Sequence, residues 1–92
     1  MIKLNHNFVV DSNKNNYILM LDKHKEDSNK KPVYETLGYY STLEGAIYGA
    51  KSIFTRIRLG SEVFNLEQAL EEIRKIHREW VDMLEEVMRN DG

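Results

Sequence analysis

Cysteine is absent from the sequence, and proline occurs once, at Pro32. Without cysteine the chain can form no disulfide, no thiolate metal site and no cysteine nucleophile. Long apolar runs are also missing near the start, where Phe8–Val10 is too short for the core of a signal peptide or for a membrane span. We therefore expect a cytoplasmic protein that is neither secreted nor embedded in a membrane.

Motifs of catalysis are missing as well, since the sequence has no glycine-rich phosphate loop, no Gly-x-Ser-x-Gly elbow and no nucleophile beside a base. Its three histidines, His6, His24 and His77, are expected on a tail, a loop and a helix, without further ligands at metal spacing. In the last helix Glu71 and Lys75 are four residues apart, as on a solvated face. We expect a non-enzymatic protein without a metal or cofactor.

The composition is that of an ordinary globular domain, with 41% hydrophobic and 30% charged residues among 92. We expect a single domain over residues 1–92, small enough that burial by a partner subunit would add to its stability. Charge is distributed unevenly: residues 1–60 carry nine Lys/Arg and six Asp/Glu, a net +3, whereas residues 61–92 carry four and nine, a net −5. This asymmetry argues against a uniformly basic nucleic-acid binder and favours a charged partner.

Three strands are predicted at about residues 8–11, 17–23 and 33–40, because these runs are rich in β-branched and aromatic residues. Residues 12–16 favour a turn, and the polar residues 22–32 predict a solvated, mobile loop. Gly38 indicates a bulge or a close packing contact. The expected product is a three-stranded antiparallel meander.

Two helices are predicted to follow, at about residues 42–59 and 65–89. Ser41 with Glu44 is a capping box for the first helix, Gly60 suits its C-cap, and Asn65 suits the N-cap of the second. The fold class is therefore α+β, with two antiparallel helices packed on one face of the meander. Apolar residues of the second helix recur at intervals of three and four, and this seam could serve the core or a homodimer. Its central members are Ile73, Ile76, Trp80 and Met83.

Binding residues are predicted in two places on the strands. Tyr34, Tyr39 and Tyr40 are candidates for partner binding, because two helices cover only one face of a sheet and exposed rings on the other would form an interface. The alternative is nucleic-acid contact by the lysine-rich hairpin loop, which Asp22, Glu26 and Asp27 interrupt. Its cations are Lys23, Lys25, Lys30 and Lys31, with Lys51, Arg56 and Arg58 as an extension from the first helix.

One stretch of the chain has a family resemblance. A strand ending in Gly38-Tyr39-Tyr40 leads into Ser41-Thr42-Leu43-Glu44, and Leu66-Glu67-Gln68-Ala69-Leu70 and Ile73 follow in a charged helix. Over about residues 17–84 this pattern resembles small uncharacterised accessory proteins of Gram-positive phages and prophages. No functional residue carries over from that group.

The resemblance implies a phage or prophage protein in the cytoplasm of a bacterial host. Such proteins act by occluding a host protein, so the implied function is protein binding that inhibits host defence, as an anti-CRISPR inhibitor does to a nuclease or CRISPR effector. The acidic last helix would suit charge mimicry of nucleic acid, or it is an ordinary solvated face. The carboxylates concerned are Glu79, Asp82, Glu85 and Glu86.

Overall fold

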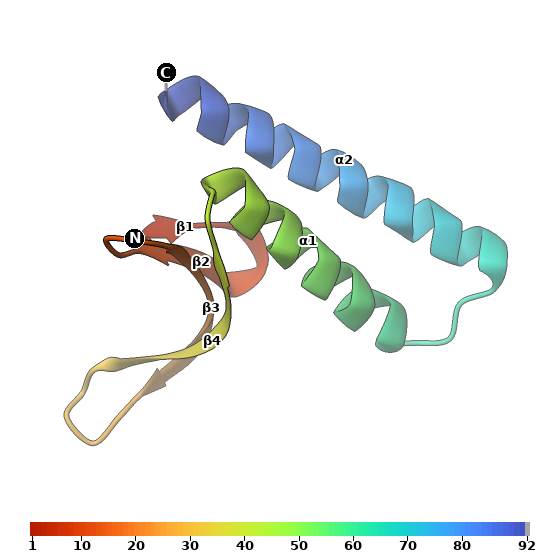
Figure 1. The fold of residues 1–92 in the computed structure, drawn as a ribbon. Helices are drawn as coiled ribbons and strands as arrows, with labels where there is room; N and C mark the ends of the chain where they lie inside the picture. Colours follow the sequence, from red (N-terminus) through yellow and green to blue (C-terminus); the bar gives the residue numbers. More distant parts are fainter. Residues whose placement is uncertain (92) are drawn as a thin grey trace. The chain divides into compact units, whose positions relative to one another are not determined.

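The computed structural model describes the backbone of residues 1–91 and the side chains of residues 1–89. It is an α+β fold in which an antiparallel sheet of four strands, in the order β1-β2-β3-β4, precedes two helices (Figure 1). In this part of the chain no helix is both long and apolar enough to cross a membrane. The elements are β1 (Ile2–Lys3), β2 (Phe8–Ser12), β3 (Tyr17–Glu26), β4 (Pro32–Tyr40), α1 (Leu43–Gly60) and α2 (Leu66–Asp91).

Strand β1 corrects the expectation of three strands. It pairs with β2 through only two residue pairs, Ile2 with Val10 and Lys3 with Val9. A short 3-10 turn, Asn5–Asn7, reverses the chain between them, and His6 and Asn7 adopt left-handed backbone conformations with φ of 60° and 69°. The two residues of β1 are both exposed, so they show no alternation of buried and exposed positions. The strand is therefore defined by its pairing partner and not by a local sequence signal.

The hairpin between β3 and β4 is longer than expected, because the strands extend into the segment predicted as a mobile loop. Only residues 27–31 form the turn. The Asp27 carboxylate oxygen Oδ1 accepts hydrogen bonds from the backbone N–H of Asn29 at 2.8 Å and of Lys31 at 3.0 Å. An aspartate that closes a turn in this way replaces backbone bonds that a loose loop would leave to water. In the turn after β2, Asn13 Oδ1 accepts from Asn15 and Asn16 in the same manner.

The structure contradicts the predicted N-cap of the first helix and confirms that of the second. At α1 the capping side chain is Thr42, whose Oγ1 accepts from the Gly45 N–H at 3.0 Å, so the predicted Ser41–Glu44 box is wrong by one residue. A Cβ on Gly45 would lie 3.0 Å from the same oxygen, which explains why glycine fits there. At α2 the Asn65 cap is confirmed: Gln68 N–H donates to Asn65 Oδ1 at 2.8 Å, and Asn65 N–H donates to Gln68 Oε1 at 3.2 Å.

The chain forms two compact units, a sheet unit of Met1–Ala46 and a helical unit from Ile47 onward. Buried apolar side chains of the sheet unit include Phe8, Val10 and Leu19. In the helical unit, α1 and α2 are antiparallel, since Arg58 pairs with Glu72 while Lys51 contacts His77. The predicted packing of the helices on one sheet face concerns the placement of the two units and stays a prediction, as does the single domain.

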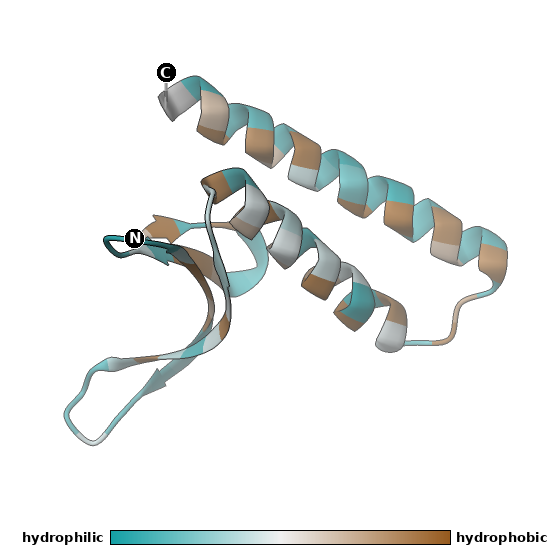
Figure 2. Cartoon of the chain, in the orientation of Figure 1, coloured by the Kyte–Doolittle hydropathy of each residue, from teal (hydrophilic) through white to brown (hydrophobic). Residues whose placement is uncertain are grey.

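Along α2, hydrophobic residues recur between hydrophilic ones over its whole described length (Figure 2). Ile76, Trp80 and Leu84 are buried, and the Trp80 ring centroid lies 6.2 Å from that of Phe54 in α1. These three residues follow at intervals of four and so share one face of α2, which contacts α1 at Trp80. The helical unit is thus a two-helix hairpin with an aromatic contact at its centre.

Candidate functional site

The three predicted tyrosines of β4 do not form one patch. Tyr34 pairs with Asp22 and Tyr39 with Ile18, whereas Tyr40 pairs with Tyr17. Paired residues of antiparallel strands share a sheet face, and residues 18 and 22 lie on the face opposite residue 17. A bulge between the Gly38 and Thr36 pairs inserts one extra residue in β4. Tyr34 and Tyr39 therefore share one face, and Tyr40 lies on the other.

Of these rings only Tyr39 is largely exposed, at 64%, while Tyr34 and Tyr40 are half-buried. Tyr40 packs over Gly38 in its own strand, where an added Cβ would lie 3.1 Å from the ring atom Cε2. An aromatic ring that covers a strand glycine stabilises the strand. The Tyr40 ring thus packs within its own strand, and of the three rings Tyr39 alone is largely exposed.

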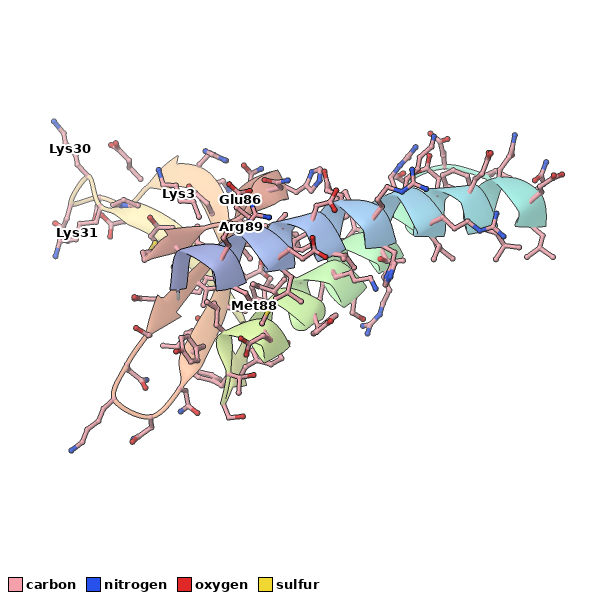
Figure 3. The ribbon with its side chains drawn as sticks, turned by 90° about the horizontal axis from the view of Figure 1, so that it is seen from above. Lys3, Lys30, Lys31, Glu86, Met88 and Arg89 are labelled. Carbon is pink, nitrogen blue, oxygen red and sulfur yellow. The ribbon has the colours of Figure 1, made fainter. Side chains whose placement is uncertain are left out.

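The predicted lysine patch does not converge. Lys23, Lys25, Lys30 and Lys31 are all exposed, but Lys23 Nζ lies 3.3 Å from Glu35 Oε2 on the neighbouring strand. Lys30 and Lys31 leave the hairpin tip in opposite directions (Figure 3). Phosphate binding by several lysines requires that they face one ligand. Lys30 and Lys31 at the tip therefore do not face one ligand, and Lys23 is paired with Glu35.

The acidic candidates of α2 lie mainly on its solvent side. Asp82, Glu85 and Glu86 are exposed, while Glu79 is half-buried and interacts within the chain. Glu86 and Met88 project from opposite sides of the helix (Figure 3), as two residues that are 200° apart on a helix must. The Glu86 carboxylate and the apolar Met88 side chain therefore occupy different faces of α2.

The predicted dimer seam lies mostly inside the chain. Ile76 and Trp80 are buried, Met83 is half-buried, and only Ile73 is exposed, at 38%. Trp80 makes the ring contact with Phe54 described above. A second copy could not use Ile76 or Trp80 without unpacking them, so these two residues belong to the core.

A groove between α1 and α2 is the main feature that the sequence did not predict. It consists of two adjoining hollows of about 460 Å³ and 420 Å³, both lined by Lys51 and Ile73. We call it the helical groove. Its other residues are Tyr48, Ser52, Thr55 and Arg56 from α1 and Arg74, His77, Arg78, Val81 and Asp82 from α2.

Charge in the helical groove is predominantly positive. Four cations, Lys51, Arg56, Arg74 and Arg78, face a single carboxylate, Asp82. Lys51 Nζ donates to His77 Nδ1 at 2.5 Å, and Arg56 Nη2 donates to Ser52 Oγ at 2.9 Å. Among the residues that the structure describes, none of these cations forms an ion pair with a carboxylate. The groove is therefore suited to a negatively charged ligand.

The repulsive pair Arg74 and Arg78, four residues apart in the sequence, was the only local signal of this groove. Lys51 and Arg56 join them because the antiparallel alignment of α1 and α2 sets residue 51 beside residue 77. That alignment depends on long-range contacts. Periodicity within each helix does not specify it.

An exposed apolar stripe runs along α2 beside the groove. Leu66, Leu70, Ile73 and Met88 are 76%, 43%, 38% and 54% exposed. His77 and Val81 lie on the same stripe by helical spacing and line the groove. We call these six residues the exposed stripe. Tyr48, 52% exposed, adds an aromatic ring from α1.

Arg58 holds the end of α1 to the start of α2. Its Nε lies 3.3 Å from Glu72 Oε2, its Nη1 lies 3.6 Å from Glu62 Oε2, and its guanidinium lies 5.2 Å from the centre of the Phe64 ring. This corrects the expectation that Arg58 extends a nucleic-acid patch, because its charge is paired within the hairpin. Arg58 instead fixes the alignment of the two helices and therefore the groove between them.

No cluster of three or more potential metal ligands occurs in the described part of the chain. Of the histidines, His24 Nε2 lies 2.7 Å from Asn7 Oδ1 and His77 contacts Lys51. The helical unit thus presents a surface that is both apolar and cationic. No family model, curated protein or solved structure matches this chain.

Proposed function

We propose that this chain is a non-enzymatic protein-binding module that holds a segment of its partner against the helical groove. The exposed stripe is the observation that carries the proposal. Large apolar side chains scattered singly on a surface are normal, but a contiguous set marks an interaction site. Here Leu66, Leu70 and Ile73 follow one another along α2, next to a groove that one helix could occupy.

Burial of the exposed stripe would supply part of the free energy of binding. Full burial of a leucine or isoleucine side chain contributes about 1.5–3 kcal/mol. Leu66, Leu70 and Ile73 together would contribute about 2–5 kcal/mol once their present partial burial is considered. Micromolar affinity requires about 8 kcal/mol net of the cost of association. The stripe alone falls short of it, so the cations and Tyr48 must contribute as well.

The narrower proposal is that the chain is a phage or prophage accessory protein that occludes a nuclease or CRISPR effector in the bacterial cytoplasm. The family resemblance over residues 17–84 supports it, together with the exposed Asp82, Glu85 and Glu86 on α2. An acidic surface of this kind can enter a channel built for nucleic acid.

Nucleic-acid binding is the second candidate, and the unpaired cations of the helical groove favour it. Lys51, Arg56, Arg74 and Arg78 lie around one hollow surface, unlike the lysines of the hairpin tip. Binding of this type would weaken steeply with rising salt, because phosphate contacts release counterions. A mobility shift measured at two salt concentrations distinguishes this candidate from apolar protein binding.

The test is affinity capture from bacterial lysate with a matched pair of variants. Leu70→Gln with Ile73→Gln removes the centre of the exposed stripe, and Val63→Gln changes an apolar residue that is 98% exposed outside it. We expect a protein captured by wild type and by Val63→Gln to be lost from the double variant. The captured protein, once purified, should form a binary complex in titration calorimetry. Recovery of the same proteins by all three baits, or of none by any, contradicts the proposal.

A further inference from the structure

We infer that the partner segment in the helical groove is an acidic amphipathic helix, with apolar residues at intervals of three and four and carboxylates beside them. This inference rests on the proposed function and specifies the chemistry of the partner. The charge of the groove, the spacing of the exposed stripe and the poor fit of two other occupants lead to it.

The charge of the groove requires an acidic ligand. Arg74 and Arg78 are one helical turn apart on α2, and Lys51 and Arg56 oppose them from α1. Like charges at this spacing repel each other, and among the lining residues Asp82 is the one carboxylate against four cations. Carboxylates of a partner would remove that repulsion and form charge-assisted hydrogen bonds with the two arginines.

The spacing of the stripe matches a helix. Leu66, Leu70, Ile73, His77 and Val81 follow at intervals of four, three, four and four residues. From Leu66 to Met88 the stripe extends about 33 Å at 1.5 Å per residue. A third helix that packs along a two-helix hairpin presents its own apolar residues at the same intervals. A partner helix of about six turns would cover the stripe.

A second copy of this chain fits the stripe but not the charge. The stripe is nearly symmetric about His77, with Ile73 and Val81 four residues to either side and Leu66 and Met88 eleven residues to either side. An antiparallel copy of α2 would therefore align the apolar residues. It would also bring the arginines of the two copies close together, because Arg74 and Arg78 would lie opposite residues 80 and 76 of the copy. A parallel copy in register would set each arginine against its equivalent. Self-association is disfavoured by this repulsion.

Nucleic acid fits the charge but not the apolar surface. Phosphates could contact the four cations, but Ile73 and Val81 form part of the wall, and Leu66, Leu70 and Met88 would gain no partner. Only two rings, Tyr48 and the His77 imidazole that contacts Lys51, are among the lining residues on which a base could stack. An acidic amphipathic helix uses both the cations and the stripe, so it is the occupant that the surface favours.

The test measures fluorescence anisotropy with a designed peptide of about six helical turns. It carries leucine at intervals of three and four and glutamate elsewhere. One comparison peptide has glutamine for every glutamate, another has serine for every leucine, and a single-stranded oligonucleotide of equal charge is the third probe. We expect the Leu/Glu peptide to bind at least about tenfold more tightly than each of the three.

Variants of the chain locate the binding. Arg74→Gln with Arg78→Gln should weaken binding of the Leu/Glu peptide by at least about tenfold. Lys75→Gln is the matched control, because Lys75 adjoins Arg74 but lies outside the groove and pairs with Glu72 at 3.9 Å. It should change the affinity by less than about twofold. Circular dichroism confirms that each variant keeps its helix content.

Three results would overturn the inference: equal affinity for the glutamine peptide, no effect of the arginine variant, or tighter binding of the oligonucleotide. A dimer of the free chain at micromolar concentration in sedimentation would also do so, since it would show that the charge does not prevent self-association. If any of these occurs while the Leu70/Ile73 variant still loses its captured partner, the proposed function survives and only the acidic chemistry fails. If the Leu70/Ile73 variant also keeps its captured partner, the proposed function fails as well.

Discussion

In the sheet unit, polar side chains of the two turns bond within their own segments, whereas in the helical unit four cations and a row of apolar side chains face outward. Asn13 and Asp27 each accept backbone N–H groups of their own turn. The helical unit instead depends on contacts between its two helices, such as Phe54 with Trp80 and Arg58 with Glu72. Turn side chains whose hydrogen bonds are made within their own segment need no partner. An apolar surface that its own chain leaves uncovered is where a partner is expected.

The largest effect on stability is expected at Trp80, which is a core residue of the helical unit. Trp80→Ala should lower the free energy of unfolding by about 3–5 kcal/mol, because Trp80 is fully buried and its removal leaves a cavity beside Phe54. Met88→Ala, on the exposed part of the same helix, should cost less than about 0.5 kcal/mol. Urea denaturation followed by circular dichroism measures both. If the wild-type chain were a dimer and Trp80→Ala were a folded monomer, Trp80 would instead belong to a dimer interface.

The next effect is expected at Arg58, which carries the contact between the ends of the two helices. Arg58→Ala should cost about 1–2 kcal/mol, because it removes the ion pairs with Glu62 and Glu72 and the contact with Phe64. Arg56→Ala is the control, since among the described residues Arg56 bonds only to Ser52, on its own helix. Equal losses in the two variants would show that the helical unit does not depend on this long-range cluster.

Features set by neighbouring residues could be predicted from the sequence, and features set by distant ones could not. The Asn65 cap and the apolar intervals of α2 depend on residues three or four apart, and the structure confirms both. Strand β1 depends on Val9 and Val10, and the β4 bulge that puts Tyr34 and Tyr39 on one face depends on register with β3. The helical groove depends on which residue of α1 opposes His77. No local pattern carries this information.

The cap of α1 gives a smaller but discriminating prediction, because the sequence and the structure name different residues. Thr42→Ala should cost about 1 kcal/mol, since Thr42 Oγ1 accepts the Gly45 N–H. Ser41→Ala should change the free energy of unfolding by less than about 0.5 kcal/mol, as expected for an exposed residue without this bond. Thermal or urea denaturation of the two variants decides between them. A larger loss for Ser41→Ala would return the cap to the residue that the sequence favours.

The smallest effect is expected at Lys23, the one lysine of the β3–β4 hairpin that is paired with a carboxylate across the strands. Lys23→Gln should cost about 0–0.5 kcal/mol, because the Lys23 and Glu35 side chains are 38% and 53% exposed and water screens their attraction. A double-mutant cycle with Glu35→Gln measures the coupling directly. If the coupling exceeded about 1 kcal/mol, the hairpin would depend on a long-range charge pair as the helical unit does on Arg58. The contrast between a locally satisfied sheet unit and a helical unit held by distant contacts would then fail.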